Sequence, residues 1–432
     1  MKKIIYLCFF YFLLWANSAH AISLIRDTEV EEAVLTWVKD IFNAANLDPD
    51  SAQIMLVNDP TINAFVAGGQ TIFIHTGLIT QSKALDDLMF VLSHETGHIV
   101  GGHITRGITA YKNAQTATLI STILGGVLAV ASGRPDAGIA VMMGSQSSAL
   151  GSFLTYRQTE ESSADRTAVD IMQKLGYSMQ GFTDTMQAIQ QFERINMDED
   201  SGYLRTHPLS QNRMQDVARF TKNAPKPKPN AKFDRIRAKL IGFMNNPNDN
   251  LQQYKDDSPA SQYIRVISLY RQSKHKKAFN LLDKMIEAEP NNRYLYELKG
   301  QFYFETGRIS QAITNYEKAN ELKPLAPLIE TALAQSYLES KSPANARKAL
   351  DLLQHVVIEE DESPLPWRLM ATAYNILKDT LGAQYAMVEY NFALNRKAIA
   401  LASAKKLITK IPKDHPHYQR LQDIIALSNK KD

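Results

Sequence analysis

The chain has 432 residues, which is too long for one ordinary hydrophobic core, so we expect about two or three domains. Apolar residues make up 44% of the sequence and charged residues 22%, values typical of globular proteins. The formal net charge is only +3 and the basic residues are spread out, so nothing in the composition suggests a nucleic-acid binder.

The first 21 residues have the form of a secretory signal peptide. Lys2 and Lys3 precede an apolar run at 4–15, and residues 19–21 (Ala-His-Ala) have the small side chains of a cleavage site. We therefore expect export, with cleavage after Ala21. The alternative is an uncleaved membrane anchor. The apolar run is short for that role, because a span needs about 20 residues.

The single cysteine, Cys8, falls inside this predicted signal peptide. The mature chain would then contain no thiol, which excludes disulfide bonds and zinc–thiolate sites. An exported protein without disulfides needs a large core, and this chain is long enough to build one.

Residues 22–222 predict an α+β domain that is mostly helical and has a small sheet. Residues 29–45 have the apolar spacing of a helix, whereas residues 53–57 (QIMLV) and 70–74 (QTIFI) have the composition of strands. Residues 63–69, which end in two glycines, separate these strands.

A cluster of histidines lies on the next predicted helix, Leu85–Arg106. His94 and His98 are four residues apart, which places both imidazoles on one helix face, where they can bind one metal ion. Glu95 could reach a water on that ion without binding the metal. This H-E-x-x-H pattern is typical of zinc peptidases, in which the metal lowers the pKa of a water and the glutamate takes its proton. The alternative is a helix with hydrogen-bonded or solvated histidines.

The same helix does not supply a third ligand. A metzincin pattern, H-E-x-x-H-x-x-G-x-x-H, would need a histidine at position 104, where the chain has Ile104, so His103 is one residue short. We expect His103 to lie just outside the metal ligands or on the helix surface, and the third ligand to come from elsewhere in the chain.

Two uncharged stretches, 114–131 and 137–154, come next. The first is 18 residues long, which is the lower limit for a membrane span, and glycine, serine, threonine and glutamine dilute it. We expect a helical hairpin that touches the membrane peripherally and moves as a lid. The alternative is a hairpin that spans the membrane.

The missing ligand is predicted in Glu161–Asp165 (ESSAD), because the two acidic residues are four apart and share a helix face. Glu161 could bind the metal while Asp165 accepts a hydrogen bond from a ligand imidazole and fixes its tautomer. Glu160 is held in reserve as the ligand. The alternative for the whole segment is a solvated acidic helix face.

A proline-rich linker at 223–231 separates this domain from a helical region at 232–432. Ala278, Ala312 and Ala346 are evenly spaced along the chain, and Pro290 and Pro324 are separated by the same interval. A period of about 34 residues with small residues, an aromatic residue and a closing proline resembles the tetratricopeptide repeat. The sequence therefore predicts an all-α solenoid after the first domain.

The segments 94–98 (HETGH), 161–165 (ESSAD) and 206–208 (THP), with Arg213, together resemble the gluzincin peptidases that include the heat-shock membrane protease and the CAAX prenyl protease. The segment from Asn63 to Leu78 is also similar to that family. The resemblance implies a zincin-type peptidase fold for the first domain.

The resemblance also implies one Zn²⁺ per chain, held by His94, His98 and Glu161, with Glu95 as the general base. His207 matches a histidine that can occupy the fourth zinc position and keep the enzyme inactive. The alternatives for His207 are a hydrogen-bond donor to the transition state and a turn residue before a proline.

The strand of Gln70, Thr71, Ile72, Phe73 and Ile74 would be the sheet edge on which an extended substrate pairs. One departure concerns the third ligand, because relatives often carry an arginine three residues before the ligating glutamate. Here an R-x-x-E spacing from residue 157 selects residue 160, whereas the E-x-x-A-D spacing selects residue 161, which we prefer.

The order of signal peptide, peptidase and repeats matches periplasmic members of the family. It implies a location in the periplasm, and clients that are unfolded or stalled outer-membrane β-barrel proteins. The repeats would dock these clients or the outer-membrane assembly machinery, and would help assembly while the peptidase degrades failed precursors. The alternative is a chaperone or adaptor scaffold whose zinc site is catalytically minor.

Overall fold

The computed structural model divides the chain into two compact units. The first comprises Met1–Arg26 with Glu31–Asp234, and the second Asp27–Val30 with Arg235–Asp432. The predicted signal peptide and both uncharged stretches between 114 and 154 fall outside the residues that the structure describes. These described residues are 23–67, 69–103, 158–195, 207, 213, 216, 219–221, 224–361 and 363–429.

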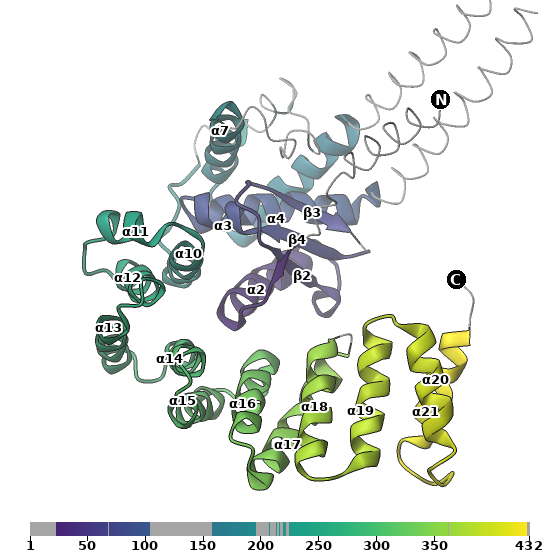
Figure 1. Ribbon diagram of the computed structural model, residues 1–432. Coiled ribbons are helices and arrows are strands. Elements are labelled where there is room, and N and C mark those ends of the chain that lie inside the picture. Colours follow the sequence, from purple (N-terminus) through teal and green to yellow (C-terminus); the bar gives the residue numbers. More distant parts are fainter. Residues whose placement is uncertain are drawn as a thin grey trace, which may run out of the picture. The chain divides into compact units, whose positions relative to one another are not determined.

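The first unit contains a four-stranded mixed sheet (Figure 1). The strand order is β1-β2-β4-β3, in which β2 and β4 are parallel and the two outer pairs are antiparallel. Both predicted strands are confirmed to within one residue. The strands are β1 (Leu24–Ile25), β2 (Gln53–Val57), β3 (Ala64–Ala67) and β4 (Thr71–His75).

The expectation that Gln70–Ile74 forms the sheet edge is wrong. Residues 71–75 form β4, which pairs with β2 on one side and with β3 on the other, and Ile72 and Ile74 are fully buried. The edge strands are β1 and β3, and β3 lies within the residues expected to connect the two predicted strands. Gly69, with a φ of +102°, makes the turn that folds β3 back onto β4.

Helix α2 (Thr28–Ala44) confirms the predicted N-terminal helix, and a short helix α3 (Thr76–Gln81) follows the sheet. Helix α4 (Leu85–Val100) lies in the core, and every residue from 85 to 97 is buried. The Asp87 carboxylate caps its start by accepting from the backbone N–H groups of residues 83 and 84. A second helix covers residues 158–175, and α7 (Gln180–Ile195) packs on α4.

Helix α4 is shorter than predicted. The expected helix ran to position 106, but α4 ends at Val100, where Gly101 and Gly102 follow. Gly102 has a φ of +61°, a left-handed conformation that ends helices and that glycine adopts without steric cost. The chain therefore turns away from the helix axis before His103.

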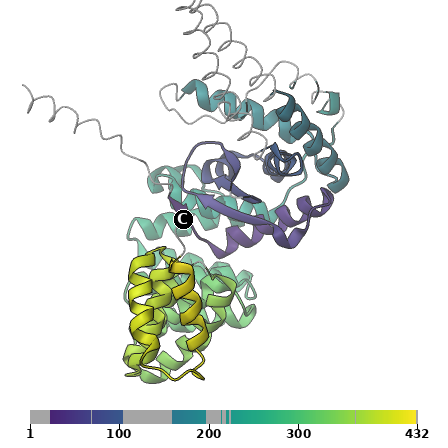
Figure 2. The same ribbon diagram turned by 90° about the vertical axis from the view of Figure 1, so that its right-hand side faces the viewer.

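None of the described helices is both long enough and apolar enough to cross a membrane. The second unit consists of helices that follow one another in contacting pairs (Figures 1 and 2). Its helices are α10 (Ala231–Met244), α11 (Pro247–Gln253), α12 (Pro259–Arg271), α13 (His275–Ala288), α14 (Arg293–Glu305), α15 (Ile309–Leu322), α16 (Pro327–Glu339), α17 (Pro343–Glu359), α18 (Pro364–Ile376), α19 (Thr380–Ala393), α20 (Lys397–Ile408) and α21 (Tyr418–Asn429).

The evenly spaced small residues of the sequence lie in the contacts between these helices. Ala278, Ala312 and Ala346 are fully buried on α13, α15 and α17. A Cβ atom at Gly300 would lie 3.0 Å from the ring of Tyr316, so the missing side chain lets α14 and α15 approach closely. The small residues that recur in the sequence therefore lie where helices of this unit pack closely together.

Candidate metal centre

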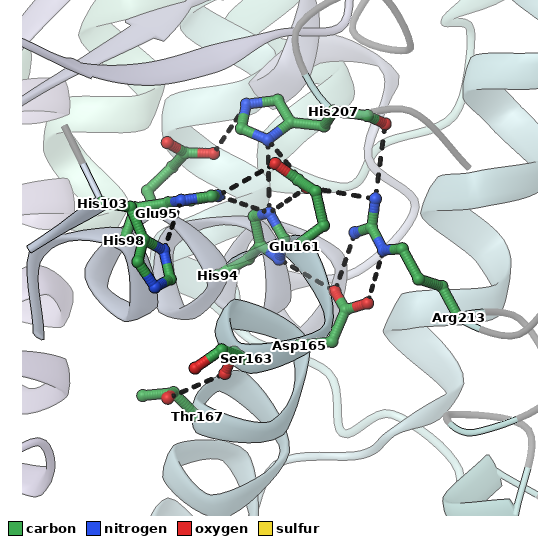
Figure 3. Close-up of polar contacts among 10 residues, drawn as sticks. All are labelled: His94, Glu95, His98, His103, Glu161, Ser163, Asp165, Thr167, His207 and Arg213. Carbon is green, nitrogen blue, oxygen red and sulfur yellow. Dashed lines mark hydrogen bonds and ion pairs between the residues drawn. The ribbon is translucent and has the colours of Figure 1, made fainter. Parts of the chain in front are cut away.

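Helix α4 supplies the first two candidate ligands. His94 and His98 are one helical turn apart, and their Nε2 atoms lie 3.1 Å from each other (Figure 3). Both imidazoles are buried, at 0% and 8% exposure. Glu95, between them in sequence, is also buried. The spacing predicted from the sequence thus brings both rings to one point inside the protein.

The helix of residues 158–175 packs directly against this turn of α4. A Cβ atom built on Gly97 would lie 2.8 Å from the Cα and the carbonyl oxygen of Ala164, so the two helices meet backbone to backbone. This approach brings a Glu161 carboxylate oxygen to 3.3 Å from His94 Nε2, and the other oxygen to 3.5 Å from His98 Nε2.

His207 completes the cluster from a distant part of the sequence. Its Nδ1 lies 3.3 Å from His94 Nε2 and 3.2 Å from Glu161 Oε2, and its side chain is buried. The ligand atoms of His94, His98, Glu161 and His207 all lie within 4.8 Å of one another. The Nε2 atom of His207 faces Glu95, 3.4 Å from Oε1.

The four donors fit one zinc ion. Tetrahedral zinc with bonds of about 2.0–2.1 Å to nitrogen and oxygen holds its donors about 3.3 Å apart. Five separations in the cluster run from 3.1 to 3.5 Å, and all of its ligand atoms lie within 4.8 Å of one another. Three imidazoles and one carboxylate are also donors that zinc prefers, and no thiolate is needed. The cluster is therefore compatible with a single Zn²⁺.

A buried ion pair between Arg213 and Asp165 supports the cluster. His94 Nδ1 lies 2.9 Å from Asp165 Oδ1, so the ring presents its other nitrogen to the metal position. Arg213 donates to both oxygens of Asp165, over 2.6 and 2.9 Å, and its Nη1 lies 3.1 Å from Glu161 Oε2. Arg213 is only 1% exposed and also donates to the backbone carbonyl of His207.

The carboxylates of the site differ in their electrostatics. Burial would raise the pKa of Asp165, but hydrogen bonds from Arg213 and His94 outweigh it and lower this pKa to about 2. The pKa of Glu161 is also held well below its usual range, because hydrogen bonds from imidazoles outweigh burial. Burial raises the pKa of Glu95. The candidate ligand Glu161 therefore stays charged at neutral pH, whereas the raised pKa of Glu95 lets it both accept and carry a proton.

The two histidines of α4 also differ. Burial would lower the pKa of His94, but the carboxylates of Asp165 and Glu161 outweigh it and raise this pKa to about 9. Burial, followed by the positive charge of His94, lowers the pKa of His98 to about 2. His98 is therefore neutral and ready to bind a cation, whereas at His94 a proton and a cation compete for the same nitrogen.

The structure separates the alternatives that the sequence left open. Glu161, and not Glu160, lies in the cluster. His103 is buried and its Nδ1 lies 2.9 Å from His98 Nδ1, so of its two expected positions it takes the one just outside the candidate ligands and not the helix surface. The two neighbours of His207 in the THP segment, Thr206 and Pro208, lie outside the described residues.

Two contributors had no assigned role in the sequence reasoning. Arg213 was noted as part of the family resemblance, and only its spatial position reveals the pairing with Asp165. Gly97 lies within the H-E-x-x-H pattern, where any residue is accepted by the pattern itself. A glycine between two candidate ligands was the available signal that another backbone comes close there.

The sequence profile of peptidase family M48 matches residues 26–221. The chain is 26% identical over 362 residues to the β-barrel assembly-enhancing protease of Yersinia pestis, covering 81% of this chain and 73% of that protein. Its counterpart in Escherichia coli K12 is 24% identical with the same coverage. Metalloprotease LoiP of E. coli K12 is 22% identical over 194 residues, covering 44% of this chain and 70% of LoiP.

Replacement of Gly97 by alanine should weaken the metal centre. The new Cβ atom would clash with the backbone at Ala164, so the helices must separate and carry Glu161 away from His94 and His98. We expect a loss of stability of about 1–3 kcal/mol and weaker zinc binding, measured by urea unfolding and chelator competition. Val100→Ala, at an exposed position of the same helix, is the control. Equal zinc affinity in Gly97→Ala and wild type would contradict the close-approach argument.

Replacement of Arg213 by methionine should destabilise the fold. It leaves Asp165 and Glu161 buried without their guanidinium partner, which typically costs about 3–5 kcal/mol. Urea unfolding with excess chelator measures this cost without any contribution from zinc. Arg219→Met, which removes an exposed guanidinium 3.8 Å from Asp216, should change little. A similar small effect at position 213 would show that the buried ion pair has no such role.

Proposed function

Residues 26–221 belong to peptidase family M48, and from this premise we propose that the protein is an exported zinc metalloendopeptidase that acts on outer-membrane β-barrel proteins. The family match confirms the zinc-peptidase resemblance predicted from the motifs. The observation that carries the proposal is the convergence of His94, His98 and Glu161 beside the buried Glu95. These residues come from two helices that are about 60 positions apart in the sequence.

In this proposal His94, His98 and Glu161 hold the zinc ion. When bound, the ion supplies a Lewis acid that lowers the pKa of a water and polarises the scissile carbonyl. Glu95 follows the first ligand and accepts the proton of the attacking water, then delivers it to the leaving amine. Its burial raises its pKa, which favours this two-way transfer. Asp165 holds His94 in the tautomer that presents Nε2 to the ion.

His207 keeps the enzyme latent. Its Nδ1 takes the fourth corner of the cluster, where a water must bind, while its Nε2 faces the carboxylate of Glu95. One imidazole thus covers both the open position and the general base. Activity requires that His207 leave both contacts, which is the switch that the sequence resemblance implied.

An extended substrate pairs with β3. The N–H of His75 donates to the carbonyl of Asn63 over 3.0 Å, so in the antiparallel pair the backbone groups of Phe65 also face β4. Those of Ala64 and Val66 then point away from β4. The N–H of Val66 faces the Glu95 carboxylate, whereas the backbone groups of Ala64 can bond to an added strand. Helix α4 packs against β3, so this strand lies beside the turn that carries Glu95. The predicted β-augmentation therefore moves from residues 70–74 to β3.

The clients and the location follow from the relatives. Two of them are named β-barrel assembly-enhancing proteases, and the predicted signal peptide at 1–21 agrees with a periplasmic enzyme. The helices from 232 onward form a tetratricopeptide solenoid that docks clients or the assembly machinery. The burial of the evenly spaced alanines on α13, α15 and α17 supports that arrangement. A hollow of about 530 Å³ lined by α16 and α18 residues offers a place to dock.

One observation favours the alternative of a chaperone or adaptor scaffold. Four protein ligands around a zinc ion are typical of structural sites, whereas catalytic sites keep one position open. His207 closes the cluster in this way. The two readings differ in whether the site ever opens, so they make opposite predictions for variants of Glu95 and His207.

Replacement of Glu95 by glutamine should abolish proteolysis and leave zinc binding intact. The amide cannot accept the proton of the attacking water, so casein cleavage and self-cleavage should fall about 10²- to 10⁴-fold. Chelator competition should give a zinc content equal to that of wild type, since Glu95 is not among the four ligands. Unchanged cleavage by Glu95→Gln would contradict the proposed base.

Replacement of His207 by alanine should raise cleavage above the wild-type level, because the fourth corner and Glu95 are both released. The double variant Glu95→Gln/His207→Ala is the control and should be inactive. If neither wild type nor His207→Ala shows cleavage that depends on Glu95, the scaffold alternative is the correct one.

A further inference from the structure

His103 lies against a metal ligand and has no role in the chemistry described so far. Its ring is buried, with Nδ1 2.9 Å from Nδ1 of His98. The two ring planes meet nearly edge-on, at 78°, with centroids 5.0 Å apart (Figure 3). His98 therefore has Nε2 directed at the cluster and Nδ1 directed at His103.

This contact exists because the chain leaves the helix. Residues five apart on an α-helix point about 140° away from each other, so His98 and His103 could not meet on a continuous helix. The left-handed conformation of Gly102 turns the chain back over α4. Gly101 leaves the room for the ring, because a Cβ atom there would lie 2.1 Å from His103 Nε2. Gly101 and Gly102 together thus allow His103 to contact His98.

We propose that His103 is a positioning residue that holds His98 in its metal-binding orientation. A His98 ring that binds through Nε2 carries its proton on Nδ1, so His103 Nδ1 is the acceptor and its own proton is on Nε2. This inference rests on the metal centre proposed above. It gives each histidine ligand of α4 its own acceptor, Asp165 for His94 and His103 for His98.

The two acceptors differ in kind. Asp165 is a carboxylate that strengthens the donor power of His94, whereas His103 offers the lone pair of a ring nitrogen and orients His98. Loss of such an outer partner typically costs about 10- to 100-fold in metal affinity. We expect that loss when the His103 acceptor is removed.

The test compares two replacements of His103 in the purified full-length chain. His103→Asn keeps an acceptor oxygen close to the position of Nδ1, whereas His103→Leu keeps volume and removes the acceptor. Competition with a chromophoric chelator should show zinc binding about 10- to 100-fold weaker in His103→Leu and close to wild type in His103→Asn. Urea unfolding with excess chelator reports any purely structural effect. Equal zinc affinities for the two variants would overturn the proposal.

Gly102 gives a second route to the same contact. Gly102→Val disfavours the left-handed turn and should weaken zinc binding about as much as His103→Leu, whereas Gly102→Asn tolerates that turn and should not. If the glycine acts through His103, the double variant Gly102→Val/His103→Leu should bind no more weakly than either single variant. Additive losses would show that the turn and the ring act separately and would contradict the proposal.

A failure of this inference differs from a failure of the metal centre. His94→Ala/His98→Ala should abolish high-affinity zinc binding. If that variant still binds zinc as wild type does, the metal centre is wrong and the role of His103 falls with it. If binding is lost there but His103→Leu binds zinc as tightly as wild type, only the role of His103 is wrong.

Discussion

The contact between the backbones of α4 and the helix of residues 158–175 is the constraint on which the rest of the site depends. At Gly97 any larger residue would strike Ala164, and this closeness sets the distance from the histidines to Glu161. A carboxylate one helical turn further away could not share a metal ion with both rings. The ligand set is thus fixed by helix packing, and the side chains only complete it.

The second constraint is charge, because the charged groups of the site are buried. Glu95, Glu161 and Asp165 are all buried, and Arg213 is the one permanent cation that directly contacts any of these three among the residues that the structure describes. A bound divalent cation would bring the sum of these charges to zero. The same need explains why the pKa of His94 is raised to about 9, since its proton supplies positive charge at the same place. Donor distances and charge balance therefore point to the same ion, and they do so independently.

The sequence predicts what is local and misses what depends on neighbours. The spacing of His94 and His98 follows from helix geometry, and the strands at 53–57 and 71–75 follow from composition. Nothing local says which strands are the edges, and the strand Ala64–Ala67 is short and is followed by glycine, so its pattern is too weak to be recognised. His207 came only from a family resemblance. The position of His103 depends on the end of the helix at two glycines. These glycines are visible in the sequence, but the helical pattern around them predicts a helix that continues through them.

Arg213 contacts both Asp165, which supports His94, and His207, the proposed switch residue. Its hydrogen bonds to Asp165, of 2.6 and 2.9 Å, fix the carboxylate that orients His94. Its hydrogen bond to the carbonyl of His207 is longer, at 3.4 Å. Charge-assisted bonds to a buried carboxylate are the stronger of the two kinds. In the proposed switch, withdrawal of His207 would break only the longer contact on Arg213, and Asp165 would keep its partner. His94 would then keep its orientation while the fourth corner opens, so the proposed switch would not require the rest of the centre to rearrange.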